Sequence, residues 1–194
     1  MGHYREALAD LDHALTLDEN FVYALVNRAK VYRKIGQFEE ALADLDHTIT
    51  LIEKDRWSTT QQALADPDHA IPHDTDWYWY ERALLHLLME QQVATHADIE
   101  MAIKIANISL QHIPEHIADY YRISFNLALY HLARGNAEES EAKYSRLLAS
   151  CAAIPTIRDV GIDMQEFLAI VPEHELAKHI LIRISERIVE LSRT

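Results

Sequence analysis

The sequence predicts an all-α fold in which short antiparallel helix pairs stack into an elongated solenoid. Residues 7–17 return at residues 41–51 with nine of eleven positions identical, an offset of 34 residues. A period between about 20 and 50 residues is typical of stacked supersecondary units that bury their apolar faces against one another. The chain is 49% hydrophobic and holds only four glycines and five prolines, as expected of a protein that is helical almost throughout. Stacked units leave a concave surface, which favours binding over catalysis in a closed cleft.

The first element, residues 2–20, is interpreted as the second half of a repeat, because Gly2 aligns with Gly36. Its apolar face, formed by Ala7, Leu8, Leu11, Ala14 and Leu15, is then covered on one side only. Three explanations stay open. The chain is a piece of a longer protein, its start is misassigned, or the half repeat borrows a helix. In the last case, two such faces could meet in a homodimer.

The second element, residues 22–55, holds a whole repeat. Large, small and aromatic residues alternate at helical spacing before and after the chain-reversing Gly36, in the order Leu25, Arg28, Ala29, Tyr32 and then Phe38, Ala41, Leu45, Thr48. This order resembles the tetratricopeptide repeat, which implies a right-handed superhelix of antiparallel helix pairs. The small residues leave room for close helix crossing, and a glycine can adopt the left-handed conformation that reverses the chain. Arg28 departs from the pattern, since an apolar residue is usual at that position.

The remaining elements follow with weaker matches. Residues 56–75 are an insertion with two prolines, and residues 76–110 form a repeat in which Thr95 stands where alanine is expected. Residues 121–154 form a further repeat with its own turn glycine, Gly135. Residues 155–192 are interpreted as a degenerate repeat and a capping helix, with an apolar stripe of Leu176, Ile180, Ile184, Ile188 and Leu191. The whole chain, 1–194, is thus predicted to form a single array.

Composition narrows the class of protein and its partners. The formal net charge is −13, which disfavours nucleic acid and favours a basic or apolar peptide. The single cysteine, Cys151, excludes an internal disulfide and is interpreted as a small buried residue. Without a signal segment or a run of 18 apolar residues, the sequence predicts a cytoplasmic protein with no membrane contact.

Twelve histidines raise the question of a metal site, but their spacing does not support one. His69 and His73 are four residues apart, as are His112 and His116, yet a proline lies between the members of each pair and breaks the helical geometry. With four glycines in all, the chain also lacks a phosphate-binding loop. We therefore expect no catalytic residues, no metal and no cofactor, and no enzymatic activity.

The family resemblance implies a peptide-binding groove lined by the first helix of each repeat. Carried onto this sequence by repeat alignment, the groove residues are Tyr23, Asn27, Lys30, Trp77, Tyr80, Leu84, Arg122, Phe125, Asn126 and Leu129. Asn27 and Asn126 fall where chaperone-tail binders of this family place an asparagine that clamps a peptide, with Lys30 and Arg122 able to assist. Glu81 departs from that pattern.

The run Trp77-Tyr78-Trp79-Tyr80 is the most distinctive local feature. Adjacent helical residues point about 100° apart, so these four aromatic side chains cannot all be buried in the core. We expect Trp77 and Tyr80 to face the groove as binding anchors. The sequence therefore predicts a module that binds a peptide or helix of a partner protein. The alternatives are a homodimer formed through residues 2–20, and the sensor arm of a large bacterial signalling ATPase, whose terminal repeats the segments 76–83 and 125–130 resemble.

Overall fold

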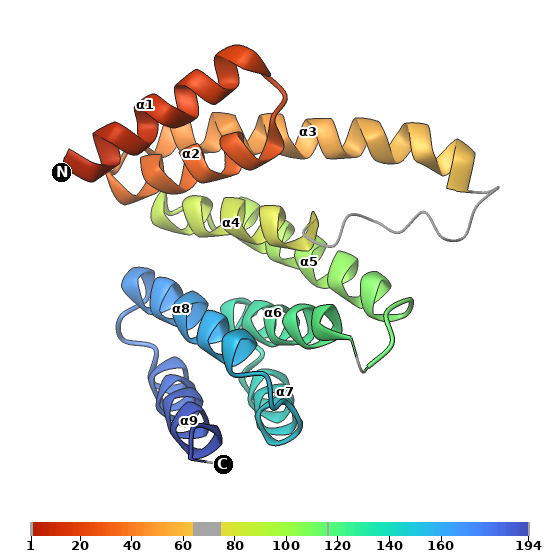
Figure 1. Cartoon of the computed structure of the whole chain (residues 1–194), viewed down its shortest axis with the longest axis vertical. Coiled ribbons are helices and arrows are strands. Elements are labelled where there is room, and N and C mark those ends of the chain that lie inside the picture. The colour runs from red at the N-terminus through yellow and green to blue at the C-terminus, as the bar shows by residue number, and fades with distance from the viewer. Residues whose placement is uncertain (1, 64–74, 116, 194) are drawn as a thin grey trace. The chain divides into compact units, whose positions relative to one another are not determined.

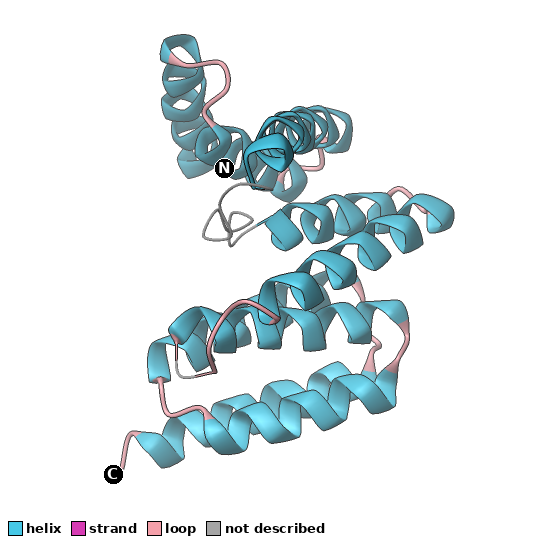
Figure 2. Ribbon diagram, turned by 90° about the vertical axis from the view of Figure 1, so that its right-hand side faces the viewer, coloured by secondary structure: helices cyan, strands magenta, loops and turns pink. Residues whose placement is uncertain are grey.

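A computed structural model describes residues 2–63, 75–115 and 117–193. In these ranges the chain forms helices joined by turns and loops (Figures 1 and 2). The helices are α1 (Gly2–Leu17), α2 (Val22–Lys34), α3 (Phe38–Ala63), α4 (Thr75–Leu88), α5 (Gln92–Leu110), α6 (Ala118–Arg134), α7 (Ala137–Ser150), α8 (Ile154–Ile170) and α9 (Glu175–Leu191). The predicted all-α class is confirmed.

The chain divides into two compact units, Met1–Asp98 and Ile99–Thr194, and the boundary between them falls inside α5. In the first unit each helix packs on the next, α1 on α2, α2 on α3 and α3 on α4. In the second unit α6 pairs with α7 and α8 pairs with α9, while α6 also contacts α8 and α7 also contacts α9. Consecutive antiparallel pairs are therefore the building principle within each unit.

Three turns between paired helices share one geometry. The backbone N–H of Gln37, Gln91 and Asn136 donates to the carbonyl oxygen five residues earlier, at distances of 2.9, 2.8 and 2.8 Å. The residue before each donor is left-handed, with φ of 80° at Gly36, 59° at Glu90 and 89° at Gly135. This pairing of a left-handed residue with a six-to-one hydrogen bond satisfies the last carbonyls of the first helix. The predicted role of Gly36 is confirmed, and Glu90 fills the same position without being glycine.

The core of the first unit includes Ala29, Ala41 and Leu45, which the repeat pattern selects. Val26, Ala29, Ala41, Leu45 and Leu85 form one buried cluster. The two alanines allow the close crossing of α2 and α3, because they add no side chain beyond Cβ.

At the repeat positions equivalent to Ala41, the other two repeats have Thr95 and Ser140. Each hydroxyl donates a hydrogen bond to a nearby backbone carbonyl. Thr95 donates to the carbonyl of Gln91 at 3.0 Å, and the buried Ser140 donates to the carbonyl of Ala128 at 2.8 Å. A buried hydroxyl with a backbone acceptor costs little, which explains why the departures at Thr95 and Ser140 leave the helix pairs intact.

The last helix pair is held by an apolar stripe. Ile180 and Ile184 of α9 are buried, and Leu176, Ile188 and Leu191 are partly buried. A Cβ placed on Gly161 of α8 would lie 3.3 Å from the Ile184 side chain, so this glycine permits the close approach of α8 and α9. The predicted stripe therefore faces the protein, as expected for a final helix.

The region of the predicted insertion is in part helical. α3 continues to Ala63, well past the end of the repeat predicted at residue 55, and α4 begins at Thr75. Residues 64–74, which include His69 and His73, lie outside the described residues, as does His116.

Candidate functional site

Arg28 ties together three helices of the first unit. Its Nε and Nη2 donate to the two carboxylate oxygens of Asp44 on α3 at 2.8 and 2.7 Å, and its Nη1 donates to Asp12 on α1 at 2.7 Å. The Asp44 side chain is only 8% exposed, so its charge requires this bidentate partner. Hydrogen bonding to Asp44 raises the pKa of Arg28 above its ordinary value. Arg28, which stands where an apolar residue is usual, therefore has a structural role as the partner of Asp44 and Asp12.

Arg82 repeats this arrangement one repeat later. It donates to both oxygens of Asp98 on α5 at 2.8 and 2.7 Å and to Asp46 on α3 at 2.6 Å. Burial lowers the pKa of Arg82, but the hydrogen bonds to Asp98 and Asp46 outweigh burial and leave the pKa raised. The two arginines fix the spacing of α1 to α5 within residues 1–98.

A second ionic cluster joins α2 to α4. Glu81, 2% exposed, lies 3.2 Å from the Nζ of Lys30 and 3.3 Å from the Nη2 of Arg33. A buried carboxylate requires compensating charge, and these two cations supply it. Lys30, predicted to orient a peptide, is therefore engaged in neutralising Glu81.

The aromatic side chains at the start of α2 and α4 form the accessible part of the predicted groove. Tyr23 is 70% exposed, and its ring lies 6.0 Å from that of Phe21, which is also exposed. Trp77 is half-buried, 5.2 Å from the Tyr80 ring and 5.5 Å from the Lys30 ammonium. We call Tyr23, Asn27, Lys30 and Trp77 the α2–α4 surface.

Asn27 and Arg122, the remaining polar groove candidates at the surface, make local contacts. The Nδ2 of Asn27 donates to the carbonyl of Tyr23 in its own helix at 2.7 Å. The Nε of Arg122 donates to Asp119, one turn earlier, at 3.4 Å. Both side chains are partly exposed, and a ligand would have to compete with these bonds.

Five of the predicted groove residues are buried in the structure: Tyr80, Leu84, Phe125, Asn126 and Leu129. Phe125 packs on Tyr144 of α7 with ring centroids 5.9 Å apart, and α6 contacts α8 as well as α7. The expectation that these side chains face a ligand is therefore corrected: they belong to the packing of the helices. Sequence reasoning missed this because it assigned one face of α6 to a groove, whereas α6 has neighbours on two sides.

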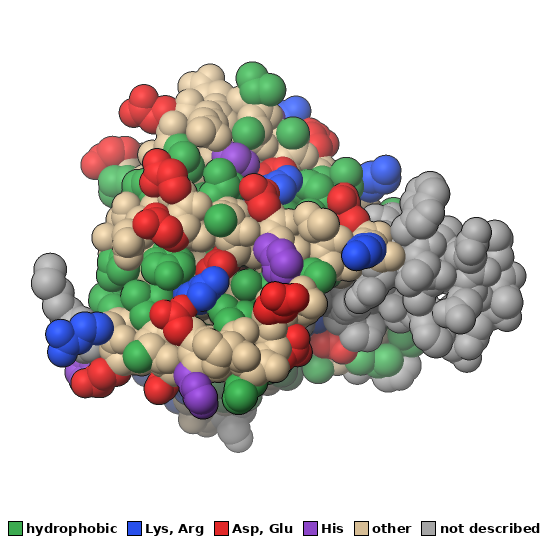
Figure 3. Space-filling model, turned by 90° about the horizontal axis from the view of Figure 1, so that it is seen from above, with side chains coloured by type: hydrophobic (Ala, Val, Ile, Leu, Met, Phe, Trp, Pro, Cys, Tyr) green, Lys and Arg blue, Asp and Glu red, His purple; other side chains and the backbone are tan. Residues whose placement is uncertain are grey.

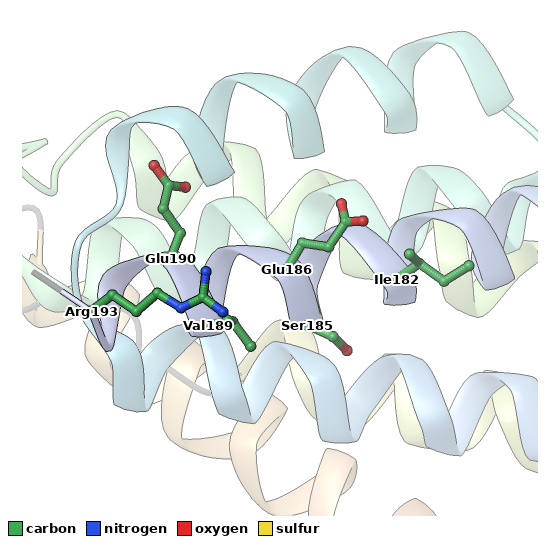
Figure 4. A pocket seen from close by; sticks show the side chains of 6 residues that line it. All are labelled: Ile182, Ser185, Glu186, Val189, Glu190 and Arg193. Atoms are coloured by element: carbon green, nitrogen blue, oxygen red, sulfur yellow. The ribbon is translucent and has the colours of Figure 1, made fainter.

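The described residues hold no metal cluster, and their single cysteine is buried. No group of three His, Cys, Asp or Glu side chains within them is arranged to hold a metal ion. Cys151 is buried, as the sequence predicted. A hollow along α9 is lined by Ile182, Ser185, Glu186, Val189 and Glu190 of this helix and by Arg193, just after its end (Figure 4). It lacks the convergent polar groups from several elements that a substrate site requires.

Two global properties limit the kind of partner. None of the described helices is long and apolar enough to span a bilayer. Acidic side chains are scattered among hydrophobic ones on the face shown in Figure 3, in keeping with the net charge of −13. Such a surface repels a phosphate backbone.

Comparison with known proteins identifies the repeat. Residues 22–54 match the family model described as tetratricopeptide repeat. No curated protein matches the sequence. Among solved structures, a kinesin-light-chain-type protein of Podosopora anserina with nearly identical TPR-like repeats is similar over 100% of this chain and 90% of its own, with a TM-score of 0.52 at 12% identity. A crystal structure of MamA gives a TM-score of 0.45 at 13% identity, covering 100% of this chain and 93% of that one. A tetratricopeptide repeat protein from Parabacteroides merdae gives 0.43 at 18% identity, covering 99% and 72%.

Proposed function

We propose that this chain, whose residues 22–54 match the tetratricopeptide repeat, is a non-enzymatic module that binds a peptide or helix of a partner protein in a groove at the α2–α4 surface. The fold supports an interaction scaffold, because stacked helix pairs present a broad extended surface. The observation that carries the proposal is the α2–α4 surface, where Tyr23 is 70% exposed and the repeat-equivalent Trp77 lies beside Lys30.

The chemistry of this surface suggests what the partner looks like. Exposed aromatic side chains supply large apolar area at low entropic cost and are enriched among binding hot spots. Lys30 and Arg33 share the single carboxylate of Glu81, so these three side chains together carry a charge of +1, much of it compensated at short range. Within a chain of net charge −13, we propose a partner segment with apolar anchors flanked by basic residues.

A selection experiment tests this proposal. A phage-displayed library of random peptides about 16 residues long is selected on the whole chain, and the affinity of enriched peptides is then measured by calorimetry. We expect Tyr23→Ser to weaken binding about tenfold or more, as for a hot-spot aromatic. Val93→Ser is the matched control, since Val93 of α5 is also strongly exposed and apolar but lies off this surface. Equal affinity for both variants would exclude the α2–α4 surface.

Self-assembly through α1 is a second candidate, favoured by the exposure of Tyr4 and Leu17 near its two ends. Deleting residues 1–20 should then convert a dimer into a monomer in light scattering. A sensor arm of a larger signalling ATPase, proposed from resemblance alone, would use the α2–α4 surface in the same way.

A further inference from the structure

α1 carries the same docking face as α3, and the internal repeat shows what covers that face in α3. Ala41, Asp44 and Leu45 of α3 are buried and correspond to Ala7, Asp10 and Leu11 of α1. In α1, Ala7 and Leu11 are only partly buried and Asp10 is exposed. Among the described residues, these positions are therefore covered by a packing partner in α3 but not fully covered in α1.

The opposite side of the two helices provides an internal control. Asp12 of α1 and Asp46 of α3 are also repeat equivalents, and each is 53% exposed. Each accepts a hydrogen bond from the Nη1 of the arginine that follows it, Arg28 at 2.7 Å and Arg82 at 2.6 Å. α1 thus makes the same ion pair toward the following helix as α3 does, and the two helices differ on the face that carries Asp10.

In α3 the corresponding face is occupied by α2. Arg28 donates two hydrogen bonds to Asp44, and Ala29 is buried in the same cluster as Ala41 and Leu45. Asp10 occupies the repeat position of Asp44, which is bound by Arg28. No hydrogen bond or ion pair reaches the Asp10 carboxylate from any described residue. Charge complementarity then specifies the missing group as a guanidinium, whose planar fork matches a carboxylate.

We infer that the open face of α1 is a docking site for a helix of another polypeptide that carries an arginine followed by alanine, with Asp10 as the residue that selects the arginine. This site lies on a different helix from the α2–α4 surface and does not depend on it. A second copy of α1, as the self-assembly candidate would require, supplies no arginine to this face and would bring two Asp10 carboxylates into one interface. Arg5 is the only lysine or arginine in the α1 sequence, and five residues of helix turn it about 140° away from Asp10.

The test uses the whole chain and a fluorescein-labelled synthetic peptide of residues 21–36, which is the α2 sequence with its flanks. Fluorescence anisotropy is expected to show saturable binding, and Asp10→Asn is expected to weaken it about tenfold, the effect of losing a charge-assisted bidentate pair. Glu6→Gln is the matched control, since it removes the same charge from an exposed position of α1 and should change affinity less than about twofold. Asp10 is exposed, so neither change should alter the circular dichroism melting curve.

A charge swap separates recognition from general charge effects. Asp10→Arg should abolish binding of the natural peptide and restore it for the peptide carrying Arg28→Asp. Any of the following outcomes would overturn the inference: no saturable binding, equal effects of Asp10→Asn and Glu6→Gln, or a concentration-dependent dimer that Asp10→Asn strengthens. Peptide that instead exchanges with α2 on α3 would bind independently of Asp10, which also overturns it.

Discussion

At the scale of single residues, the buried charges of the first unit act in the packing of the helices. Arg28 and Arg82 each join two aspartates from the helices on either side of them, and Glu81 is held between Lys30 and Arg33. A buried carboxylate is stable only while its partner remains, so these arginines are sensitive positions even though each side chain is partly exposed.

Replacing Arg28 by Met should lower the free energy of unfolding by about 2–3 kcal/mol, because Asp44 is left buried without its partner. The double variant Arg28→Met/Asp44→Leu should recover most of that loss, since both charges are removed together. Urea denaturation of the variants measures both values. Arg134→Met, which removes an exposed pair with Glu100, is the control and should cost about 0.5 kcal/mol or less. Equal losses in the single and double variants would contradict this account of Arg28.

His131 should make the stability of the protein depend on pH. Burial, together with Lys143, lowers the pKa of His131 below its ordinary value of 6.5. As the pH falls below that value, the unfolded chain binds a proton that the folded chain resists, so the free energy of unfolding decreases until the folded pKa is passed. Denaturation at a series of pH values should show a smaller decrease for His131→Gln than for the wild type. His179→Gln, at an exposed position, should follow the wild type.

At the scale of helices, the repeat pattern predicted the pairing well. Ala29, Ala41 and Leu45 are buried as their spacing indicated, and Gly36 has the predicted left-handed conformation. The ionic links were harder to predict, because Arg28 and Asp44 lie 16 residues apart and their contact depends on how the helices pack. A signal was nevertheless present in the sequence, since Arg82 and Asp98 recur with the same separation.

The groove was the least predictable feature, for a physical reason. Position along a repeat indicates which face of a helix points inward, but not whether a further helix covers that face. Tyr23 is exposed and its repeat equivalents Trp77 and Arg122 are partly buried, whereas Phe125 and its equivalents Val26 and Tyr80 are all buried. Burial of this kind is set by packing between elements, which a single sequence does not specify.

Replacing Glu90 by glycine should raise the stability of the protein, because Glu90 has a left-handed backbone conformation in its turn, with φ of 59°. A side chain in that region costs about 1 kcal/mol, and the extra freedom of glycine in the unfolded chain offsets part of the gain. We expect Glu90→Gly to stabilise the protein by about 0.5 kcal/mol and Gly36→Ala to destabilise it by about 1 kcal/mol. Opposite shifts of the two thermal midpoints support the shared turn, and shifts of the same sign would argue against it.

Phe125→Ala should lower the free energy of unfolding by about 3–4 kcal/mol, as for a large side chain lost from a core. Tyr23→Ser should change it by less than about 0.5 kcal/mol, because the side chain is exposed. Parallel urea titrations distinguish the two positions. A small effect at Phe125 would return this residue to the list of groove candidates.

At the scale of the whole molecule, the chain is a negatively charged array of helices suited to binding other proteins. The net charge of −13 disfavours nucleic acid, and the described residues hold no cluster suited to a metal. The exposed aromatic side chains among the described residues are Tyr4, Phe21 and Tyr23, whereas the large exposed apolar side chains of α8 and α9 (Ile162, Ile182 and Val189) are aliphatic. Partner binding is therefore expected in residues 1–98.

The most direct test of this claim is hydrogen–deuterium exchange of the whole chain with and without a peptide selected as above. A bound segment should slow amide exchange in α2 and at the start of α4, where Tyr23 and Trp77 lie. The account predicts protection confined to these segments and lost in Tyr23→Ser. Protection that appears instead in α6 to α9, or that persists in Tyr23→Ser, would contradict it.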